Sequence, residues 1–526
     1  MNLINIIAFF YKRVLPRVLC VLICLPLILT TGCSDTGDFT LYFGVNTAPK
    51  NLDPQLASVD SELLFVRNCF RGLYKLDEND NAVPDLAAEC TLSPDGLTYT
   101  FKLKNCEWSD KTNVTAADFR FALLRAADPS INAPQAEYIK NIIGVNENLN
   151  GTKTDIGVSA PDDKTLIITL NQPDPNFTLK LTKAIFMPCN EAFFIKCGGK
   201  YGLSKDHILT NGNFAVLKWS NEKSIELKRT VENKLDGSAV KRVILSESQT
   251  GKLNSQRIVD NEIGMTVVSG EDFTKINQSK YAVNVDFCKN YAIMFNKSTE
   301  IGQNKKLLES LAIGVDRVFI KQNMSERFKT VYTCLPEDSL VLEIAPLGGL
   351  NVKDYTFESS ATDSRALFLD AVKSFKNSKL PTLQILCPDD AEIKAILTNA
   401  IYGWQSNLGI VVNIKTVATE QELLQAVKND QYTVAFVPLE GSTEEILTFL
   451  SCNASAEYKR IINELNSTGD VNAARSLITK AADILSAEPS IIPAVSIPTA
   501  EIHSVDYQNV HFSKIDNTVD FSIIYK

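Results

Sequence analysis

The sequence predicts an α/β protein of several domains, because the chain is long and because strand-like and helix-like patterns occur along its whole length. Its 526 residues, of which 45% are hydrophobic and 22% are charged, can bury a large core. At roughly 150 residues per domain, this length predicts about three domains. No internal repeat or low-complexity linker divides the chain. We therefore expect domains that interleave in sequence.

The expected strands and helices follow from the spacing of hydrophobic side chains. Hydrophobic and polar residues alternate in residues 97–104, 166–170 and 225–227, which is the period of a half-buried strand. Hydrophobic residues three and four positions apart form one helical face in residues 393–404 and another in residues 474–485. Gly409 is the predicted end of the first of these helical segments.

The first 32 residues differ from the rest of the chain. Basic residues precede a hydrophobic run over residues 18–29, which is too short for an ordinary membrane span of about 20 residues and is typical of a secretory signal. Because Thr-Thr-Gly-Cys33 follows, residues 1–32 resemble a bacterial lipoprotein signal peptide, whose cysteine is lipidated. Thr30 departs from the leucine usual there, and simple cleavage or a retained anchor are the alternatives. The prediction is a lipoprotein of the periplasm or cell envelope, anchored to the membrane through Cys33.

The charge and the cysteines exclude several classes of protein. Without the three basic residues of the signal segment, 50 Lys and Arg face 62 Asp and Glu, a net charge of −12, so we expect no nucleic-acid partner. The mature cysteines contain no C-x-x-C pair, which argues against a zinc ribbon or a redox motif. We expect one to three disulfides and at least one free thiol. The nine cysteines are Cys69, Cys90, Cys106, Cys189, Cys197, Cys288, Cys334, Cys387 and Cys452.

A segment with a tryptophan and two carboxylates, Asp110 and Asp118, is the first candidate for a catalytic site. Thr115 precedes a helical pattern, and Asp118 stands three residues later, which is close to a capping box. We therefore expect Asp118 to cap a helix. The chain contains no H-E-x-x-H, G-x-S-x-G or P-loop motif, and its three histidines are far apart. We predict no catalytic residue, no metal site and no cofactor.

The same segment carries a family resemblance. Trp108-Ser-Asp110 followed by Val114-Thr-Ala-Ala-Asp-Phe119 resembles the W-S-D-G-x-P-V-T-A-x-D-F signature of the extracytoplasmic oligopeptide-binding proteins. These are family-5 solute-binding subunits of peptide ABC transporters. Further matches follow in family order: Leu52-Asp-Pro54, Phe70-Arg-Gly-Leu73, Asn211-Gly212, Glu262-Ile-Gly-Met265, Asp316-Arg317, Trp404-Gln405, Leu408-Gly409 and the proline pair Pro489 and Pro493.

The resemblance implies a two-lobed periplasmic-binding-protein fold (type II, large three-domain form) with mixed sheets and a ligand cleft closed by a hinge. Lobe one would comprise residues 37–80, 204–287 and 498–526. A small extra domain would comprise residues 81–203, and lobe two residues 288–497. The implied function is a monomer that captures oligopeptides as extended strands between the lobes and delivers them to a membrane permease.

The ligand-binding strands of the family correspond to Ser58-Val59-Asp60 in lobe one and Pro438-Leu439-Glu440 in lobe two. Pro438 has no N–H to offer a ligand. The family has a tryptophan where Leu439 stands and, three residues later, an aspartate for the peptide ammonium where Ser442 stands. A neutral hydroxyl cannot replace that carboxylate.

Another carboxylate could recognise the ammonium group. Glu440 is the preferred candidate, and Glu444, Glu445 and Asp60 are the others, although each could also be a solvated loop charge or a helix cap. The alternatives to oligopeptides are another ligand, such as a cell-wall peptide or a nickel or haem complex, or a role in adhesion or assembly. Lys111 replaces a turn glycine of the family and Asn113 a proline, which a loop tolerates if its φ stays negative.

Overall fold

The protein is described by a computed structural model. The described residues are 39–220, 223–231, 239–342, 345–347, 350, 352–358, 360–451 and 454–526. The predicted signal peptide and Cys33 lie outside them. Within the described part of the chain, no helix is both long and apolar enough to cross a membrane.

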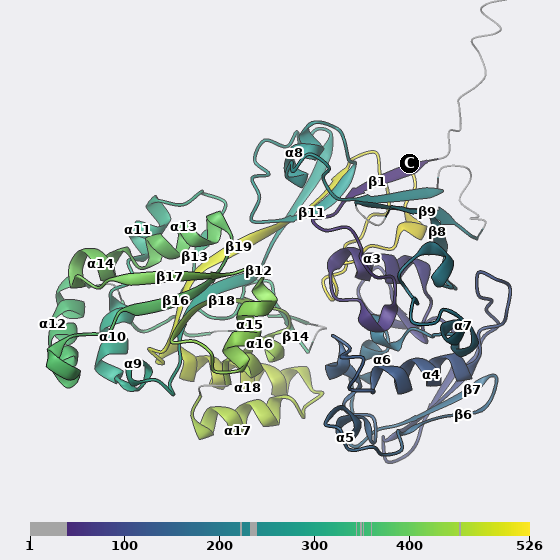
Figure 1. Cartoon of the computed structure of the whole chain (residues 1–526), viewed down its shortest axis with the longest axis horizontal. Coiled ribbons are helices and arrows are strands. Elements are labelled where there is room, and N and C mark those ends of the chain that lie inside the picture. Colours follow the sequence, from purple (N-terminus) through teal and green to yellow (C-terminus); the bar gives the residue numbers. More distant parts are fainter. Residues whose placement is uncertain are drawn as a thin grey trace, which may run out of the picture.

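One mixed sheet of eleven strands extends through the whole molecule (Figure 1). β1 is parallel to β10 and β11, and β16 is parallel to β17 and β18, whereas the other pairs are antiparallel. β13 (Lys329–Thr330) pairs with β19 beside the main path. In spatial order the other strands are β17 (Val412–Val417), β16 (Leu383–Pro388), β18 (Val434–Glu440), β12 (Tyr281–Phe295), β19 (Ile491–Ser504), β11 (Met265–Ser269), β1 (Thr40–Gly44), β10 (Arg242–Ser246), β9 (Ser224–Arg229) and β8 (Phe214–Ser220).

The long strands β12 and β19 join the two halves of the molecule (Figure 1). They pair from Tyr281↔Ser504 to Met294↔Ile491, with a register shift between Asp286 and Lys289. We call the half with β1, β8–β11 and the segment after β19 lobe one, and the half with β16–β18 lobe two. This is the predicted two-lobed α/β fold with a mixed sheet. The predicted boundaries at 287/288 and 497/498 fall beside the Lys289↔Ile497 pair, and the domain division itself stays a prediction.

A separate four-stranded sheet belongs to a small domain between β4 and α7 (Figure 1). The expected strands in residues 97–104 and 166–170 are confirmed as β5 and β7. The strands of this four-stranded sheet, in spatial order, are β4 (Ala87–Leu92), β5 (Thr98–Leu103), β7 (Thr165–Thr169) and β6 (Val158–Asp162). Its helices are α4 (Ala116–Ala126), α5 (Val145–Leu149), α6 (Phe177–Lys180) and α7 (Glu191–Lys196), with the 3-10 turns η3 (Ala136–Ile139) and η4 (Ala184–Phe186).

The small domain and lobe one share one hydrophobic core. Trp108 is buried, and its ring lies 6.4 Å, edge to face, from that of Phe70, which follows the lobe-one helix α3 (Asp60–Cys69). The C-terminal segment also packs on α3, since Asn68 Nδ2 donates to the Val519 carbonyl at 2.8 Å and Phe521 N donates to Asn68 Oδ1 at 2.8 Å. The remaining short elements here are β2 (Tyr74–Leu76), β3 (Ala82–Pro84), η2 (Pro54–Leu56), η5 (Lys205–His207) and η9 (Phe521–Ile523).

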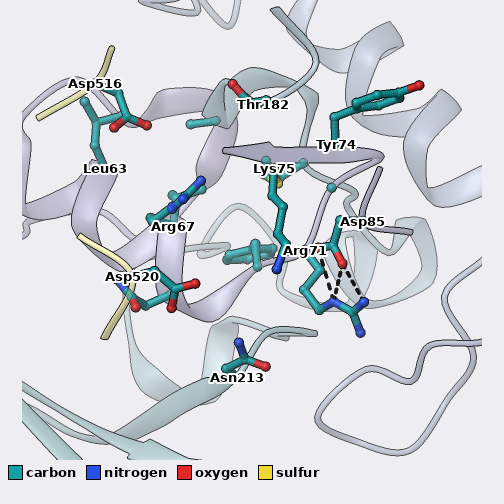
Figure 2. Close-up of a pocket in the computed structure, with 16 residues that line it drawn as sticks. Leu63, Arg67, Arg71, Tyr74, Lys75, Asp85, Thr182, Asn213, Asp516 and Asp520 are labelled. Atoms are coloured by element: carbon teal, nitrogen blue, oxygen red, sulfur yellow. Dashed lines mark hydrogen bonds and ion pairs between the residues drawn. The ribbon is translucent and has the colours of Figure 1, made fainter. Parts of the chain in front are cut away.

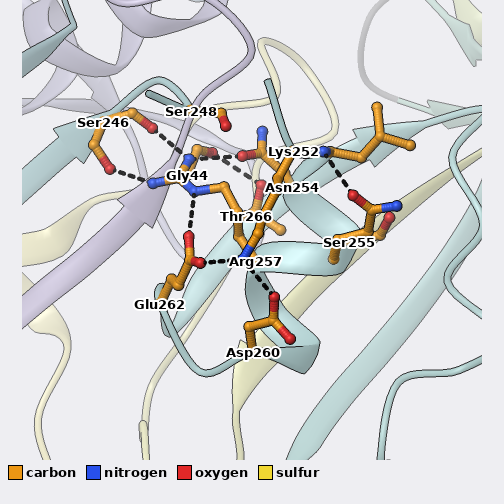
Figure 3. Close-up of polar contacts among 12 residues, drawn as sticks. Gly44, Ser246, Ser248, Lys252, Asn254, Ser255, Arg257, Asp260, Glu262 and Thr266 are labelled. Atoms are coloured by element: carbon orange, nitrogen blue, oxygen red, sulfur yellow. Dashed lines mark hydrogen bonds and ion pairs between the residues drawn. The ribbon is translucent and has the colours of Figure 1, made fainter. Parts of the chain in front are cut away.

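Helix α8 (Asn254–Val259) is attached to the sheet of lobe one by a buried arginine (Figure 3). Arg257 Nη1 donates to the Ser246 carbonyl and to Asn254 Oδ1, both at 2.8 Å, and Nη2 donates to Ser246 Oγ at 2.7 Å. Nε lies 3.7 Å from Glu262 Oε2. Because these contacts satisfy the guanidinium group, the cluster stabilises the end of β10 and offers no ligand site.

Lobe two packs helices on both faces of its part of the sheet. Alternate residues of β12 enter two different cores, with Tyr291, Ile293 and Phe295 on one face and Ala292 and Met294 on the other. The helices are α9 (Glu300–Gln303), α10 (Lys305–Ile313), α11 (Arg317–Gln322), α12 (Ala361–Ala371), α13 (Ala391–Ala400), α14 (Tyr402–Leu408), α15 (Glu420–Lys428), α16 (Thr443–Leu450), α17 (Ala456–Leu465) and α18 (Val471–Ser486). The short elements are β14 (Leu340–Val341), β15 (Ala345–Pro346), η6 (Val372–Ser374) and η7 (Lys376–Ser378).

The expected disulfides are not found among the described cysteines. Eight cysteines are free, and Cys452 lies outside the described residues. Several of them, such as Cys69 and Cys387, are buried in the separate cores of lobe one and lobe two. Burial raises the pKa of the Cys69 thiol, so this group stays protonated and behaves as a small apolar side chain.

Candidate ligand site between the lobes

The predicted site of lobe one lies at the start of α3. Asp60 is the first residue of this helix and Val59 its N-cap. Ser58 N donates to Glu62 Oε2 at 3.0 Å, and the Val59 carbonyl accepts from Glu62 N at 2.9 Å. These backbone groups already have partners, so the segment is a helix start and not a strand edge. Asp60 as a residue is exposed to solvent, although protein atoms of both lobes surround its carboxylate.

The predicted site of lobe two lies at the end of β18. Pro438, Leu439 and Glu440 pair with Tyr291, Asn290 and Lys289 of β12. On its other edge β18 pairs with β16 only through Val434 and Ala435, so residues 437–440 have no ladder partner there among the described residues. The end of β18 therefore has an edge that can accept an additional strand.

Lys289 lies between two carboxylates beside this edge. Its Nζ is 2.7 Å from Glu420 Oε2 and 3.1 Å from Glu440 Oε2. The Tyr291 hydroxyl donates to Glu420. Burial alone would lower the pKa of the Lys289 ammonium, but Glu440 and Glu420 raise it above its ordinary value. The side chain of Lys289 is only 13% exposed, whereas that of Glu440 is 48% exposed and remains accessible to a ligand.

Asp60 of lobe one faces this cluster of lobe two. Desolvation by surrounding protein atoms raises the pKa of Asp60, the negative charge of Glu440 raises it further, and the positive charge of Lys289 lowers it. Two carboxylates from opposite lobes thus lie close enough for their charges to interact. Together with Glu420 they outnumber the single ammonium of Lys289, so the facing surfaces carry an excess of negative charge.

The excess of negative charge continues into the strands that join the lobes. Lys514 Nζ contacts Asp286 and lies 3.5 Å from Glu501 Oε1. Burial, together with the charges of Asp286, Asp338 and Glu440, raises the pKa of Cys288 to about 12. This thiol therefore stays neutral and is not a nucleophile at physiological pH.

Ser442 and two of the alternative carboxylates have structural partners. Ser442 is the N-cap of α16 and forms a capping box with Glu445, in which Ser442 N donates to Glu445 Oε2 at 2.9 Å. Glu444 Oε1 accepts from Leu342 N at 2.9 Å. Ligand binding by Ser442 stays a prediction, although its hydroxyl already caps a helix. Asp60 and Glu440 are therefore the best-placed carboxylates for a ligand ammonium.

The small domain touches lobe two through residues that include Tyr138 and Pro175. The Tyr138 hydroxyl lies 3.4 Å from Glu445 Oε1 and donates to it. Gly469, in the loop between α17 and α18, packs so closely that a Cβ added to it would lie 2.1 Å from Pro175 Cγ. The small domain and lobe two are therefore in contact.

The tryptophan segment is structural and not catalytic. Thr115 N donates to Asp118 Oδ2 at 2.8 Å, and Trp108 Nε1 donates to the same oxygen at 3.2 Å, which confirms the predicted capping box at α4. Asp110 instead accepts from Thr112 N at 3.0 Å within the turn. Lys111 has a φ of 74°, so the turn keeps the conformation of a glycine.

Two other motifs form buried contacts between distant segments. Asp53 and Arg125, whose side chains are 5% and 6% exposed, form an ion pair that links lobe one to the small domain. Arg317 Nη2 donates to the Pro493 carbonyl at 2.7 Å. These contacts stabilise the fold and have no role in ligand binding.

A family model described as "Bacterial extracellular solute-binding proteins, family 5 Middle" matches residues 81–457, which is more than half of the chain. The chain belongs to this family. The relatives and structural neighbours are substrate-binding proteins and not enzymes, which agrees with the prediction that this protein is not an enzyme. Among the described residues, no group of three or more His, Cys, Asp or Glu side chains could hold a metal ion.

Relatives and solved structures agree with this membership. The chain is 26% identical to the dipeptide-binding protein of Lactococcus lactis subsp. cremoris (strain MG1363), over 81% of the chain and 80% of the relative. It is 27% identical to the periplasmic oligopeptide-binding protein OppA of Escherichia coli (strain K12), over 86% of each. The structure of Listeria monocytogenes OppA bound to peptide superposes with a TM-score of 0.73 at 22% identity, over 93% of the chain and 99% of that structure, and shares the fold.

Sequence reasoning did not identify Lys289 or Glu420. Lys289 is one polar residue within a long strand, and Glu420 begins a helix 131 positions later. Only the pairing of β12 with β18 places Lys289 beside Glu440. Neither residue has a local signal that could have indicated this contact.

Proposed function

We propose that this family-5 protein captures oligopeptides as extended strands between its lobes and delivers them to the permease of an ABC transporter. Family membership supports this function, as do the names of the relatives, which are dipeptide- and oligopeptide-binding proteins. A protein that binds many peptides must recognise the backbone they share, and addition of a strand to a sheet edge does this.

The observation that carries the proposal is the free edge of residues 437–440 beside carboxylates from both lobes. The edge of β18 supplies backbone groups for an extended peptide, apart from Pro438, which has no N–H. Leu439 is buried and fixes the strand, while the Glu440 side chain is half exposed beside Lys289. The peptide would run past Ser58 and Val59 on the side of lobe one.

Glu440 and Asp60 are the proposed partners of the peptide ammonium, in place of the aspartate that Ser442 replaces. An ammonium between two carboxylates relieves their repulsion, and each charge-assisted hydrogen bond contributes about 1.5–3 kcal/mol. The ligand therefore favours the arrangement in which both lobes contribute a carboxylate. In this proposal Glu440 makes the closer contact, because it lies on the strand that pairs with the peptide.

The remaining parts of the proposal concern location and assembly. Cys33 carries the lipid that anchors the mature protein at the cell envelope, after cleavage of residues 1–32. The protein acts as a monomer, with lobe one in residues 37–80, 204–287 and 498–526, the small domain in 81–203 and lobe two in 288–497. Lobe closure then presents the peptide to the permease.

Calorimetry with one peptide in free-amine and N-acetylated forms tests the ligand. We expect the free-amine peptide to bind more tightly, and Glu440→Gln to weaken it about tenfold without changing the already weak binding of the acetylated form. Glu457→Gln, a change at an exposed carboxylate of α17, is the matched control and should alter neither. No heat with any peptide mixture would end the peptide proposal. Equal binding of both forms would remove only the role of Glu440 and Asp60.

Metabolic labelling with palmitate tests the anchor. Wild-type protein should incorporate the label and remain with the membrane, whereas Cys33→Ala should not incorporate it. Equal incorporation in both proteins would contradict lipidation at Cys33.

A further inference from the structure

A cavity between lobe one and the small domain is separate from the facing surfaces of the two lobes (Figure 2). It has a volume of about 280 Å³, is partly open to solvent, and is lined by residues of α3, β2, η4 and the C-terminal segment. This is close to the lower end of the usual range for small-molecule sites, roughly 300–1,000 Å³. None of the residues proposed for peptide binding lines it.

The cavity brings unpaired charges of both signs together. Arg67 on α3 and Lys75 on β2 line it, and neither forms an ion pair with a described carboxylate within 4.0 Å; Arg67 Nη2 instead donates to the Leu76 carbonyl at 2.7 Å. Asp516 and Asp520 of the C-terminal segment also line it without an ion pair at that distance among the described residues. In Figure 2 the Lys75 side chain reaches inward from β2, with both aspartates on one side of it.

The other contacts of these groups leave their charges available. Asp516 Oδ1 accepts from Thr518 N at 3.1 Å, and Asp520 Oδ1 accepts from Ser522 N at 2.8 Å, both neutral donors. The positive charge of Arg229 lies near Asp520, so Asp516 is the less compensated of the two. A third cation of the lining, Arg71, is already paired with Asp85 at 2.5 Å.

The placement of these charges selects the kind of ligand. The cations come from α3 and β2, and the carboxylates come from the C-terminal segment. A ligand of one sign would be attracted by one set of charges and repelled by the other, whereas a molecule with both charges can satisfy both sets. Apolar residues such as Val66, Phe70 and Met187 complete the lining and provide contacts for a hydrocarbon side chain.

We propose that this cavity is a binding site for a small zwitterion, a free amino acid or a dipeptide. Its carboxylate lies toward Lys75 and Arg67, and its ammonium toward Asp516 and Asp520. The site is independent of the proposed peptide site, because the two share no residue. The C-terminal segment that carries Asp516 also carries Lys514, which contacts Asp286 near the strands that join the lobes.

Titration of the mature protein with L-leucine and with glycyl-leucine tests the proposal, and the comparison of the two distinguishes the amino acid from the dipeptide. We expect saturable binding of at least one of them. Its blocked forms, in which the amine is acetylated or the carboxylate is amidated, should bind at least tenfold more weakly. Lys75→Met and Asp516→Asn should each weaken the zwitterion about tenfold, because each removes one charge and keeps the shape of the side chain.

The controls separate this site from the peptide site. Lys228→Met, at an exposed lysine of β9 outside the cavity, should leave zwitterion binding unchanged. Asn at position 516 can still accept from Thr518, so folding should be preserved, and circular dichroism melting checks this. The proposal is overturned if no zwitterion binds at millimolar concentration, if the blocked forms bind equally well, or if Glu440→Gln rather than Lys75→Met abolishes binding. None of these results depends on whether oligopeptides bind between the lobes.

Discussion

Lys111 occupies a backbone conformation that suits a glycine. Its φ of 74° places it in the left-handed region, where a side chain with a Cβ costs roughly 1–2 kcal/mol. The ion pair of Lys111 with Glu107, at 3.6 Å on the surface, contributes little in return. Lys111→Gly should therefore raise the free energy of unfolding, by about 1 kcal/mol after the added flexibility of the unfolded chain is subtracted.

Denaturant unfolding of both proteins measures this difference. Lys153→Gly is a suitable control, because Lys153 is in a loop and its φ is not positive. That change should leave stability unaltered or lower it. A Lys111→Gly protein no more stable than wild type would mean that the turn is not strained.

Asp60 makes ligand binding depend on pH. Its pKa is raised above the ordinary 3.8 by desolvation and by Glu440, against the effect of Lys289. Ionisation of Asp60 therefore lowers the stability of the folded, ligand-free protein. This loss of stability is absent below pH 3.8 and complete above the raised pKa. A ligand ammonium favours ionised Asp60. Affinity for a free-amine peptide should fall as the pH decreases through the window just above 3.8.

Calorimetry in buffers of different ionisation enthalpy detects the proton that Asp60 releases when the peptide binds. Asp60→Asn should bind the peptide more weakly at neutral pH and show less proton release in this window. Unchanged proton release in Asp60→Asn would assign the titration to another group.

Single residues differ in how much their local sequence reveals. The cap at Asp118 could be predicted, because a capping box is a pattern over four consecutive positions. The contact of Lys289 with Glu440 could not, since it depends on which strands become neighbours. Lysine stands at position 111, where the family has a glycine. A lysine does not indicate a positive φ, so the sequence alone could not show whether the backbone of this turn is strained.

At the level of elements, Ser442 is the N-cap of α16, and the family resemblance predicts that it stands where the family has its ammonium-binding aspartate. Asp and Ser are similarly good N-caps, so Ser442→Asp should preserve the stability of α16 while adding a carboxylate beside the end of β18. We expect affinity for a free-amine peptide to rise about tenfold. The acetylated peptide should gain nothing.

Ser442→Ala is the matched control for the cap. It should lower the free energy of unfolding by about 1 kcal/mol and leave the preference for a free amine unchanged. If Ser442→Asp stabilises α16 without raising the affinity, the peptide ammonium does not lie near this position. Glu440 and Asp60 would then remain the candidates.

Sequence and structure agree for elements whose hydrophobic residues recur with a regular period. The expected strand in residues 225–227 lies within β9, and the helical face of residues 474–485 lies within α18. The face of residues 393–404 is split into α13 and α14, because the chain turns at Ile401, and Gly409 ends α14 with a φ of 69°. Both helices keep the same buried side, so hydrophobic spacing could not indicate the break.

At the scale of the whole molecule, the family resemblance rather than periodicity predicted two lobes. The sheet that continues through both lobes depends on β12 and β19, which are separated by about two hundred residues. The core shared by lobe one and the small domain likewise joins distant segments, through contacts such as Asp53 with Arg125. Contacts of this kind depend on tertiary packing, which local patterns do not encode.

The contact between Gly469 and Pro175 makes closure of the lobes testable. A Cβ at position 469 would lie 2.1 Å from Pro175 Cγ, so Gly469→Ala forces the small domain and lobe two apart. The φ of Gly469 is not positive, so alanine fits the backbone of this loop and folding stability should change little. If peptides are held by the closed form, Gly469→Ala should weaken their binding about tenfold, mainly through faster dissociation.

Small-angle scattering of the peptide-saturated protein should also give a larger radius of gyration for Gly469→Ala than for wild type. The double change Gly469→Ala with Pro175→Ala removes the obstructing ring and should restore both affinity and radius. Restoration would identify steric contact as the cause, since a general loss of folding in Gly469→Ala could not be reversed by a second truncation. Unchanged peptide dissociation in Gly469→Ala would mean that peptides are held without contact between these two loops, and that the lobes close on the ligand only at the end of β18 and the start of α3.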